Sequence, residues 1–499
     1  MYKAHAQLQV DKSEVLDEEY TRGFHCILQL KNGSTFIMRG GTKNRCEVML
    51  IDKERKRFAV TEVRCEHVKI NDVLLGIYEI NGEPVLFFKE SYGYTPSVYR
   101  LRFHPQTGAL VAEDLIYDFP RLGMAAMKGN VNNNIVVVKD PASDCYAIGI
   151  YRSVGERNED RIRTIHYDGH HKLLSNVVVP YPASDILNFY IMSIAVNGDK
   201  NLFLAAYGAE SLLYKNGRVY LARINADNSI PKMKPLDLAH DLRQTNAILL
   251  YDNRRNALHM LMNTEVRQGV ITGGVHAYTS SVLVIDPETL NTRSVHDLSA
   301  AKVTEAKKKI PGKSGEFSGV PQNILLHEDG STVILMEEMK YQEPSAFGST
   351  AATMTLGDIG ILVLEGDSVE RTGYYIERRQ PNLGTPNPNV MRMHGVDVIT
   401  TNKDIYLLAN EIGENIKRKE EGKRLKTLYR MDRQMVCYAL HGGKAEVLQL
   451  QEKGTQEEAI FEDFTLRGNY NEATHTFATI TKANEGSEKV ARVRWIGLE

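Results

Sequence analysis

The sequence predicts an all-β fold, an eight-bladed β-propeller of four-stranded antiparallel blades. A hairpin of two strand-like segments around a turn rich in Asn, Asp or Gly recurs along the chain, as in FHCILQL-KNG-STFIMRG and VLLGIYE-ING-EPVLFFKE. A third strand-like segment follows each hairpin, and helical periodicity is nearly absent. Four-stranded units repeated radially form a propeller.

The third strands give the number of blades. Each ends on an apolar residue, and these residues lie 52 to 79 positions apart, mainly because the loops differ in length. The eight residues are Ile51, Phe103, Ile165, Ile224, Ile285, Leu364, Leu440 and Ile496. Seven blades remain the alternative if one unit is misassigned.

The ends of the chain are expected to close the ring. Seven units have a fourth strand after a polar turn, whereas the eighth unit stops at Glu499. Segment 5–10, in which Leu8 and Val10 alternate with other residues, is expected to supply the missing strand. We therefore expect one domain over residues 1–499. Its predicted blades span about 24–65, 70–119, 132–180, 187–241, 245–299, 320–378, 392–450, and 460–499 plus 5–10.

Composition and motifs exclude several functional classes. The net charge is -2, with 42% apolar and 25% charged residues, so bulk charge does not attract nucleic acid. No apolar run approaches the roughly 18 residues of a membrane span. GxGxxG, phosphate-loop, HExxH and GxSxG motifs are missing, and no cofactor is expected. The five widely spaced cysteines (Cys26, Cys46, Cys65, Cys145 and Cys437) predict buried free thiols.

Two polar segments stand apart from the strand pattern. Residues 411–433 carry mixed charges typical of a short solvated helix or a long polar loop. Residues 301–315 are rich in Lys and connect two blades. We expect a mobile linker there, or a contact with an acidic partner.

Carboxylates recur where second strands end, which in propellers generally is the face that binds ligands. A ring of them would bind cations, sugar hydroxyls or basic groups, and a converging pair would support acid and base catalysis. The alternative is that polar residues simply begin where a buried strand leaves the core. The catalytic candidates are Glu90, Glu210, Glu265, Glu337 and Glu338; Glu411, Arg39 and Arg152 end second strands in other blades.

Aromatic residues occur in the same connections. Tyrosines in loops stack on sugars or anchor peptides, and they also fill gaps between blades. The predicted ligand-binding residues are Tyr92, Tyr94, Tyr207, Arg267, Tyr278, Tyr341 and Phe347.

The stretch IHYDGHH, residues 165–171, resembles a metal site by composition. Strand alignment instead places it in a third-to-fourth turn, on the face opposite the expected ligand face. Asp168-Gly169 would supply the positive φ that a tight turn needs. We therefore predict a simple turn, with a metal site at His166, Asp168, His170 and His171 as the alternative.

Residues 327–339 (HEDGSTVILMEEM), 358–380 and 404–411 (DIYLLANE) carry a resemblance to uncharacterised exported β-propeller proteins of Bacteroidetes. The resemblance implies the propeller fold and a periplasmic or extracellular location, with a cytoplasmic one as the alternative. It supplies no catalytic residues.

We expect a non-enzymatic scaffold that binds a protein, peptide or glycan through the face of the second-to-third strand loops. The alternative is a carbohydrate-active hydrolase or lyase with paired carboxylates in the funnel. No nucleic acid partner and no membrane span are expected.

Overall fold

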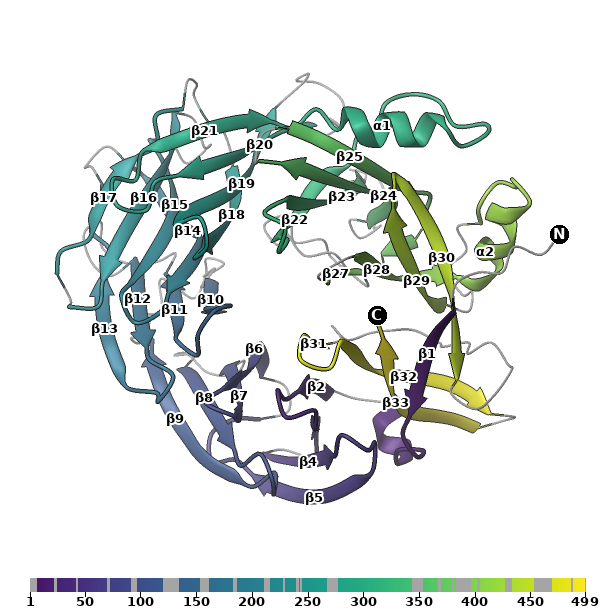
Figure 1. Ribbon diagram of the computed structural model, residues 1–499. Coiled ribbons are helices and arrows are strands. Elements are labelled where there is room, and N and C mark those ends of the chain that lie inside the picture. Colours follow the sequence, from purple (N-terminus) through teal and green to yellow (C-terminus); the bar gives the residue numbers. More distant parts are fainter. Residues whose placement is uncertain are drawn as a thin grey trace, which may run out of the picture.

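A computed structural model shows the strands arranged as a closed ring (Figure 1). It describes residues 7–21, 25–41, 44–69, 72–90, 97–119, 134–152, 161–182, 186–210, 216–227, 229–238, 242, 245–266, 277–342, 353–366, 369–378, 380–382, 396–401, 404–426, 433–452, 469–485 and 488–498. Neighbouring strands pair in chain order within each blade, which confirms the prediction of eight four-stranded antiparallel blades.

Blades 1 to 4 are formed as follows. Blade 1 is β2 (His25–Gln29), β3 (Thr35–Gly40), β4 (Arg45–Ile51) and β5 (Arg57–Arg64). Blade 2 is β6 (Val73–Ile80), β7 (Glu83–Lys89), β8 (Ser97–Phe103) and β9 (Leu110–Asp118). Blade 3 is β10 (Asn134–Lys139), β11 (Tyr146–Tyr151), β12 (Ile162–Tyr167) and β13 (Leu173–Val178). Blade 4 is β14 (Asn188–Asn197), β15 (Asn201–Ala209), β16 (Gly217–Asn225) and β17 (Lys232–Pro235).

Blades 5 to 8 complete the ring. Blade 5 is β18 (Thr245–Asp252), β19 (Ala257–Val266), β20 (Ala277–Ile285) and β21 (Thr292–Asp297). Blade 6 is β22 (Val320–Leu326), β23 (Thr332–Gln342), β24 (Thr353–Glu365) and β25 (Val369–Ile376), with β26 (Gln380–Asn382) beside β24. Blade 7 is β27 (Val396–Thr400), β28 (Ile405–Ile412), β29 (Arg433–His441) and β30 (Lys444–Glu452). Blade 8 is β31 (Asn469–Asn471), β32 (Thr476–Glu485), β33 (Glu488–Gly497) and β1 (Gln7–Lys12).

Strand β1 closes the ring, as expected from the sequence. It pairs antiparallel with β33, where Val10 lies opposite Ile496. It also pairs in parallel with β30 of blade 7, an interaction that the sequence pattern does not predict, and so joins blades 7 and 8 into one sheet. Figure 1 shows β1 between β30 and β33.

The core lies between blades. Each neighbouring pair of blades encloses one cluster of buried apolar side chains among the described residues, so every blade packs on two others. Trp495 shows how such an interface is fixed: its Nε1 donates to Thr35 Oγ1 at 2.9 Å, from blade 8 to blade 1. All five cysteines are buried free thiols, as predicted.

Among the described residues, three short helices lie outside the blades: η1 (Glu18–Thr21), α1 (Ala301–Lys308) and α2 (Gly413–Glu420). The expectation of a mobile linker over residues 301–315 is wrong for α1, because Val303 is fully buried in the interface between blades 5 and 6. Segment 411–433 does form a short helix, α2. None of the described helices is long and apolar enough to cross a membrane.

Candidate functional site

The predicted carboxylate at Glu337 lies inside the protein, in the second strand of blade 6. The expectation that it stands where that strand ends is wrong, because β23 continues to Gln342 after an irregularity between Glu337 and Met339; the Glu337 side chain is 1% exposed. Its Oε1 accepts a hydrogen bond at 3.1 Å from Nη1 of Arg378, which follows β25 and is equally buried. Burial raises the pKa of Glu337 to about 7, although the charge of Arg378 lowers it.

A second buried pair occupies the corresponding end of blade 7. Glu411 in β28 pairs with Lys419 of α2, whose Nζ also donates to the Tyr438 hydroxyl at 3.1 Å. Burial alone would lower the pKa of Lys419. The neighbouring Tyr438 and Glu411 outweigh this effect, so the pKa of Lys419 is raised. The pair fixes α2 against the end of the blade.

Two further predicted carboxylates also have cationic partners. Glu338 lies 3.5 Å from Lys307 of α1, and Glu210 lies 3.6 Å from Arg218. Glu90 is partly exposed directly after β7, and the side chain of Glu265 lies outside the described residues. Four of these six carboxylates are thus neutralised locally, a pattern that suits structural ion pairs better than an open acid and base pair.

The predicted aromatic residues differ in their environment. Tyr207 is fully buried between blades 4 and 5, and its hydroxyl donates to the Leu242 carbonyl at 2.8 Å, so it fills an interface and presents no surface to a ligand. Tyr278 in β20 is half-buried. Tyr92, Tyr94, Arg267 and Phe347 and the side chain of Tyr341 lie outside the described residues.

The two arginines at second-strand ends have different surroundings. Arg39 pairs with Glu19 at 2.8 Å and with Glu47 at 3.2 Å, and its guanidinium lies over the Tyr20 ring. Arg152 is partly exposed directly after β11.

The histidine run forms the β12–β13 turn. Oδ1 of Asp168 accepts the backbone N–H groups of His170 and Lys172, each at 2.9 Å. The left-handed residue is His171, with φ of 64°, rather than Asp168 or Gly169 as predicted. The strand begins only at Leu173, so His170 and His171 do not alternate across it.

The three histidines have different surroundings. His166 is buried and its Nε2 lies 2.9 Å from the Gly198 carbonyl, whereas His170 is exposed. Burial, and then the charges of Arg100 and Arg102, lower the pKa of His171 to about 4. Within the described part of the chain, no group of three or more His, Cys, Asp or Glu side chains is placed to hold a metal ion.

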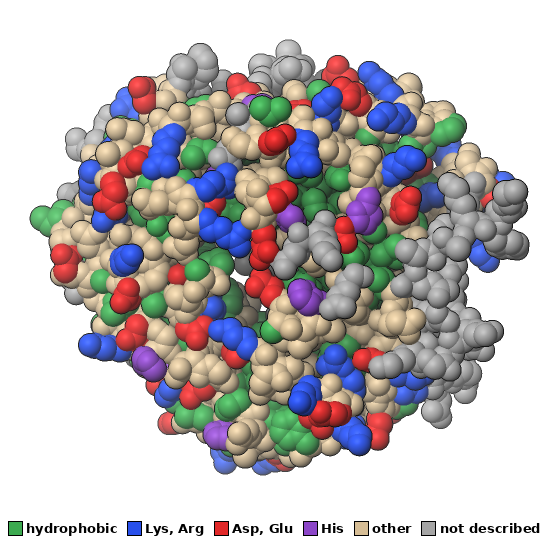
Figure 2. Space-filling model, viewed as in Figure 1, with side chains coloured by type: hydrophobic (Ala, Val, Ile, Leu, Met, Phe, Trp, Pro, Cys, Tyr) green, Lys and Arg blue, Asp and Glu red, His purple; other side chains and the backbone are tan. Residues whose placement is uncertain are grey.

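An open groove of about 780 Å³ lies between blades 4 and 5, on the face opposite the predicted one. It is formed by first-to-second turns and third-to-fourth turns, which supply Asn197, Lys200, Asn201, Arg223, Asn225, Ala226, Asp227, Tyr251, Asn253, Asn256 and Glu288. In the sequence these asparagines appear as turn residues in VNGDKN, RINADN and YDNRRN, and for that reason their shared location was missed. Figure 2 shows one face of the ring, hollowed at its middle, with acidic, basic and histidine side chains around the hollow.

Contacts across the blade interface fix the groove. Arg223 of blade 4 pairs with Glu288 of blade 5. The Tyr251 ring stacks on Phe203 with a centroid separation of 5.5 Å, and its hydroxyl donates to Asn256 Oδ1 at 2.8 Å. Burial, and then the charge of Glu288, raise the pKa of Tyr251, so the hydroxyl keeps its proton at neutral pH.

The lining is polar and electrically balanced. It contains two basic residues, Lys200 and Arg223, and two acidic ones, Asp227 and Glu288. Each asparagine amide carries two donors and an acceptor oxygen. Such a lining matches a ligand that is uncharged and dense in hydroxyl groups better than an anion, a cation or an apolar molecule.

No family model and no curated protein sequence matches the chain. Solved structures that resemble it include the WD40 domain of SCAP from fission yeast, with 11% identity, a TM-score of 0.39 and 98% of each chain covered. Polysaccharide lyase Uly1 has 10% identity and a TM-score of 0.38, covering 100% of this chain and 98% of that one. Prolyl oligopeptidase B from Galerina marginata has 8% identity and a TM-score of 0.42, covering 96% of this chain and 56% of that one. At these identities and scores, no activity or ligand carries over, and the chain is an eight-bladed β-propeller by its own strand topology.

Proposed function

We propose that the protein is a non-catalytic binding scaffold whose groove between blades 4 and 5 holds an uncharged glycan. One observation carries the proposal: five asparagines and a tyrosine from two blades line a single groove of about 780 Å³ with balanced charge. Sugar hydroxyls both donate and accept, as do amides. A periplasmic or extracellular location, expected from the resemblance to exported propellers, would suit such a ligand.

The rigidity of the site supports a binding role. The turns that line the groove connect strands whose apolar residues share one buried cluster, which includes Ala205, Leu249 and Leu258. A site built on rigid elements loses little conformational entropy when it binds. A protein or peptide partner on the second-to-third strand face stays a separate prediction.

The matched test uses two asparagines with left-handed backbones. Asn256, with φ of 45°, lines the groove, whereas Asn216, with φ of 52°, binds Glu210 on the other face. Glycine tolerates this backbone, so Asn256→Gly and Asn216→Gly each remove an amide with little strain. We expect a glycan array to show binding by the full chain, with Asn256→Gly weakening it roughly threefold to tenfold and Asn216→Gly leaving it unchanged.

Titration calorimetry of the glycan bound best would quantify the three proteins, with thermal unfolding as the check that each is folded. Absence of binding to any glycan, or equal binding by both variants, would contradict the proposal.

A carbohydrate-active hydrolase or lyase is the second candidate, and the raised pKa of Glu337 favours it. A carboxyl with a pKa of about 7 suits general acid catalysis at neutral pH. A catalytic carboxyl must also reach its substrate, whereas Glu337 is 1% exposed and bonded to Arg378. The binding proposal predicts no turnover of the bound glycan; turnover that Glu337→Gln abolishes would favour the enzyme.

A further inference from the structure

Two cysteines of blade 1 lie side by side in the interface with blade 2. Cys46 belongs to β4 and Cys65 directly follows β5; they are 8% and 3% exposed. Cys46 lies opposite Val63, two residues before Cys65, so Cys65 is its diagonal neighbour on the same face of the sheet. Both side chains belong to the buried cluster between blades 1 and 2.

Asn44 holds the backbone of Cys65 in place. The Cys65 N–H donates to the Asn44 carbonyl at 2.9 Å, and Asn44 Nδ2 donates to the Cys65 carbonyl at 2.7 Å. These two bonds extend the β4–β5 pairing past the end of β5. The position of the second thiol is therefore fixed before any ligand binds.

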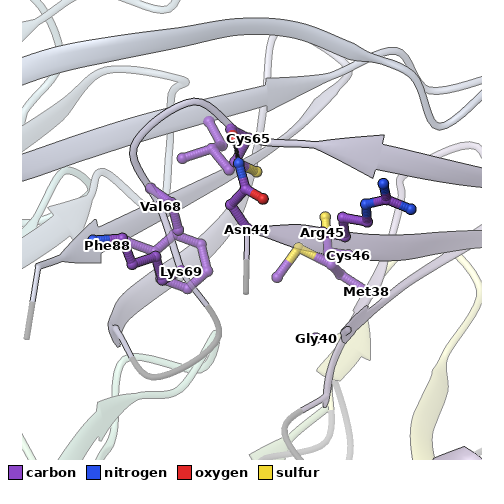
Figure 3. Close-up of a pocket in the computed structure, with 10 residues that line it drawn as sticks. Met38, Gly40, Asn44, Arg45, Cys46, Cys65, Val68, Lys69 and Phe88 are labelled. Atoms are coloured by element: carbon purple, nitrogen blue, oxygen red, sulfur yellow. Dashed lines mark hydrogen bonds between the residues drawn. The ribbon is translucent and has the colours of Figure 1, made fainter. Parts of the chain in front are cut away.

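Both cysteines line one small cavity. Its volume is about 20 Å³, enough for one water-sized species. Met38 contributes a thioether to its wall, and Gly40, which lies opposite Cys46, adds no side chain over the thiol. Figure 3 shows Met38, Cys46 and Cys65 grouped around this space.

We propose that Cys46, Cys65 and Met38 form a binding site for a single soft monovalent cation, Cu(I). Thiolate and thioether sulfurs are the donors that Cu(I) prefers, and three sulfurs fall short of the four ligands of a structural zinc site. The described residues that line the cavity include two bases, Arg45 and Lys69, and no acid. Arg45 already pairs with Glu62, so Lys69 is the lining base left to offset the net negative charge of two thiolates and one Cu(I), whereas the lack of carboxylates in this lining disfavours hard cations.

The geometry favours a bridging ion over a disulfide. Diagonal neighbours on adjacent strands have Cα atoms about 7 to 8 Å apart. Disulfides usually need a Cα separation of about 4.4 to 6.8 Å, so a bond between Cys46 and Cys65 would require the strands to move. An ion between the two sulfurs requires no such movement.

Binding would displace protons without any change of oxidation state. Each cysteine sulfur binds the ion as a thiolate, so each thiol releases its proton to solvent as its Cu–S bond forms, and the copper stays Cu(I).

The test is an anaerobic Cu(I) titration of the reduced full chain against a chromophoric Cu(I) chelator. We expect one equivalent to bind, a Cys46→Ala/Cys65→Ala variant to lose it, and Met38→Leu, which conserves volume, to bind several-fold more weakly. Cys26→Ala is the matched control, because Cys26 is buried in the same cluster but does not line the cavity.

Circular dichroism would verify that each variant is folded, and X-ray absorption of the copper complex should show sulfur ligands only. No binding by the wild-type chain, binding that survives loss of both cysteines, or equal loss in Cys26→Ala would overturn the proposal. The outcome is independent of the glycan proposal, since the two sites lie in different blades.

Discussion

The buried carboxyl of Glu337 should make the stability of the protein depend on pH in an unusual direction. An acid that is more easily protonated in the folded than in the unfolded state stabilises the fold while it is neutral. Its ordinary pKa of 4.5 rises to about 7 on burial, so between these values the folded chain binds a proton that the unfolded chain has lost. The contribution of neutral Glu337 to the free energy of unfolding is therefore fully present below pH 4.5 and is lost as the pH rises from 4.5 through 7.

The interval between the two pKa values gives the size of the effect. It corresponds to about 3 kcal/mol of unfolding free energy lost on the alkaline side. Glu337→Gln replaces the acid with an amide that stays neutral at every pH. The variant should therefore not lose this part of its unfolding free energy as the pH rises. Its free energy of unfolding should therefore fall by about 2.5 kcal/mol less than that of the wild type between pH 5 and 8.

Urea unfolding, followed by circular dichroism at several pH values, measures the difference directly. Glu54→Gln is the control, because Glu54 is exposed in a turn of blade 1 and the substitution should leave the wild-type pH dependence intact. Parallel pH profiles for wild type and Glu337→Gln would refute the reasoning, because they would mean that Glu337 ionises equally easily in both states.

Three further outcomes follow from burial. Val10→Ala removes buried methyl groups from β1 and should lower the free energy of unfolding in urea by about 2 kcal/mol. Val178→Ala, at an exposed position of a fourth strand, should lower it by less than about 0.5 kcal/mol. Equal losses would contradict the conclusion that β1 closes the ring. Val303→Ala should likewise lower the free energy of unfolding by about 2 kcal/mol, measured with heat or urea. An unchanged free energy of unfolding would mean that α1 is a solvated linker, as expected from the sequence. The imidazole of His171 should stay neutral at pH 6 in an NMR titration, because its pKa is lowered to about 4. Its contribution to stability should be lost as the pH falls from 6.5 to 4; titration near 6.5 would contradict this.

The ring itself could be predicted because it depends on local pattern. Eight third strands ending at residues such as Ile51 and Ile496 reflect the two-residue period and turn chemistry of each hairpin. The role of β1 followed from counting strands. Its parallel pairing with β30 depends on the distance between two blades, which no local pattern encodes.

Local details were wrong where the fold overrides propensity. In the β12–β13 turn the left-handed position falls on His171 although Gly169 is the better residue for it, because Asp168 caps the turn through His170 and Lys172. Val303 of α1 is buried in a segment whose lysines suggest a solvated linker, since one helical face can pack while the other carries charge.

The candidate site was the least predictable part. Glu411 was correctly located at a strand end, whereas Glu337 lies within β23. Their partners Lys419 and Arg378 come from other elements, and only the fold brings them together. The asparagines of the groove belong to turns of two blades, and a turn asparagine at the surface has the same sequence pattern whether or not it lines a groove.

Hydrogen–deuterium exchange of the full chain, with and without its bound glycan, tests the central claim most directly. The groove proposal predicts protection in the turns at 197–201, 225–227 and 251–256, from the two blades that line the groove. Protection confined to the second-to-third strand connections, with these turns unchanged, would place the ligand on the opposite face and contradict the proposal.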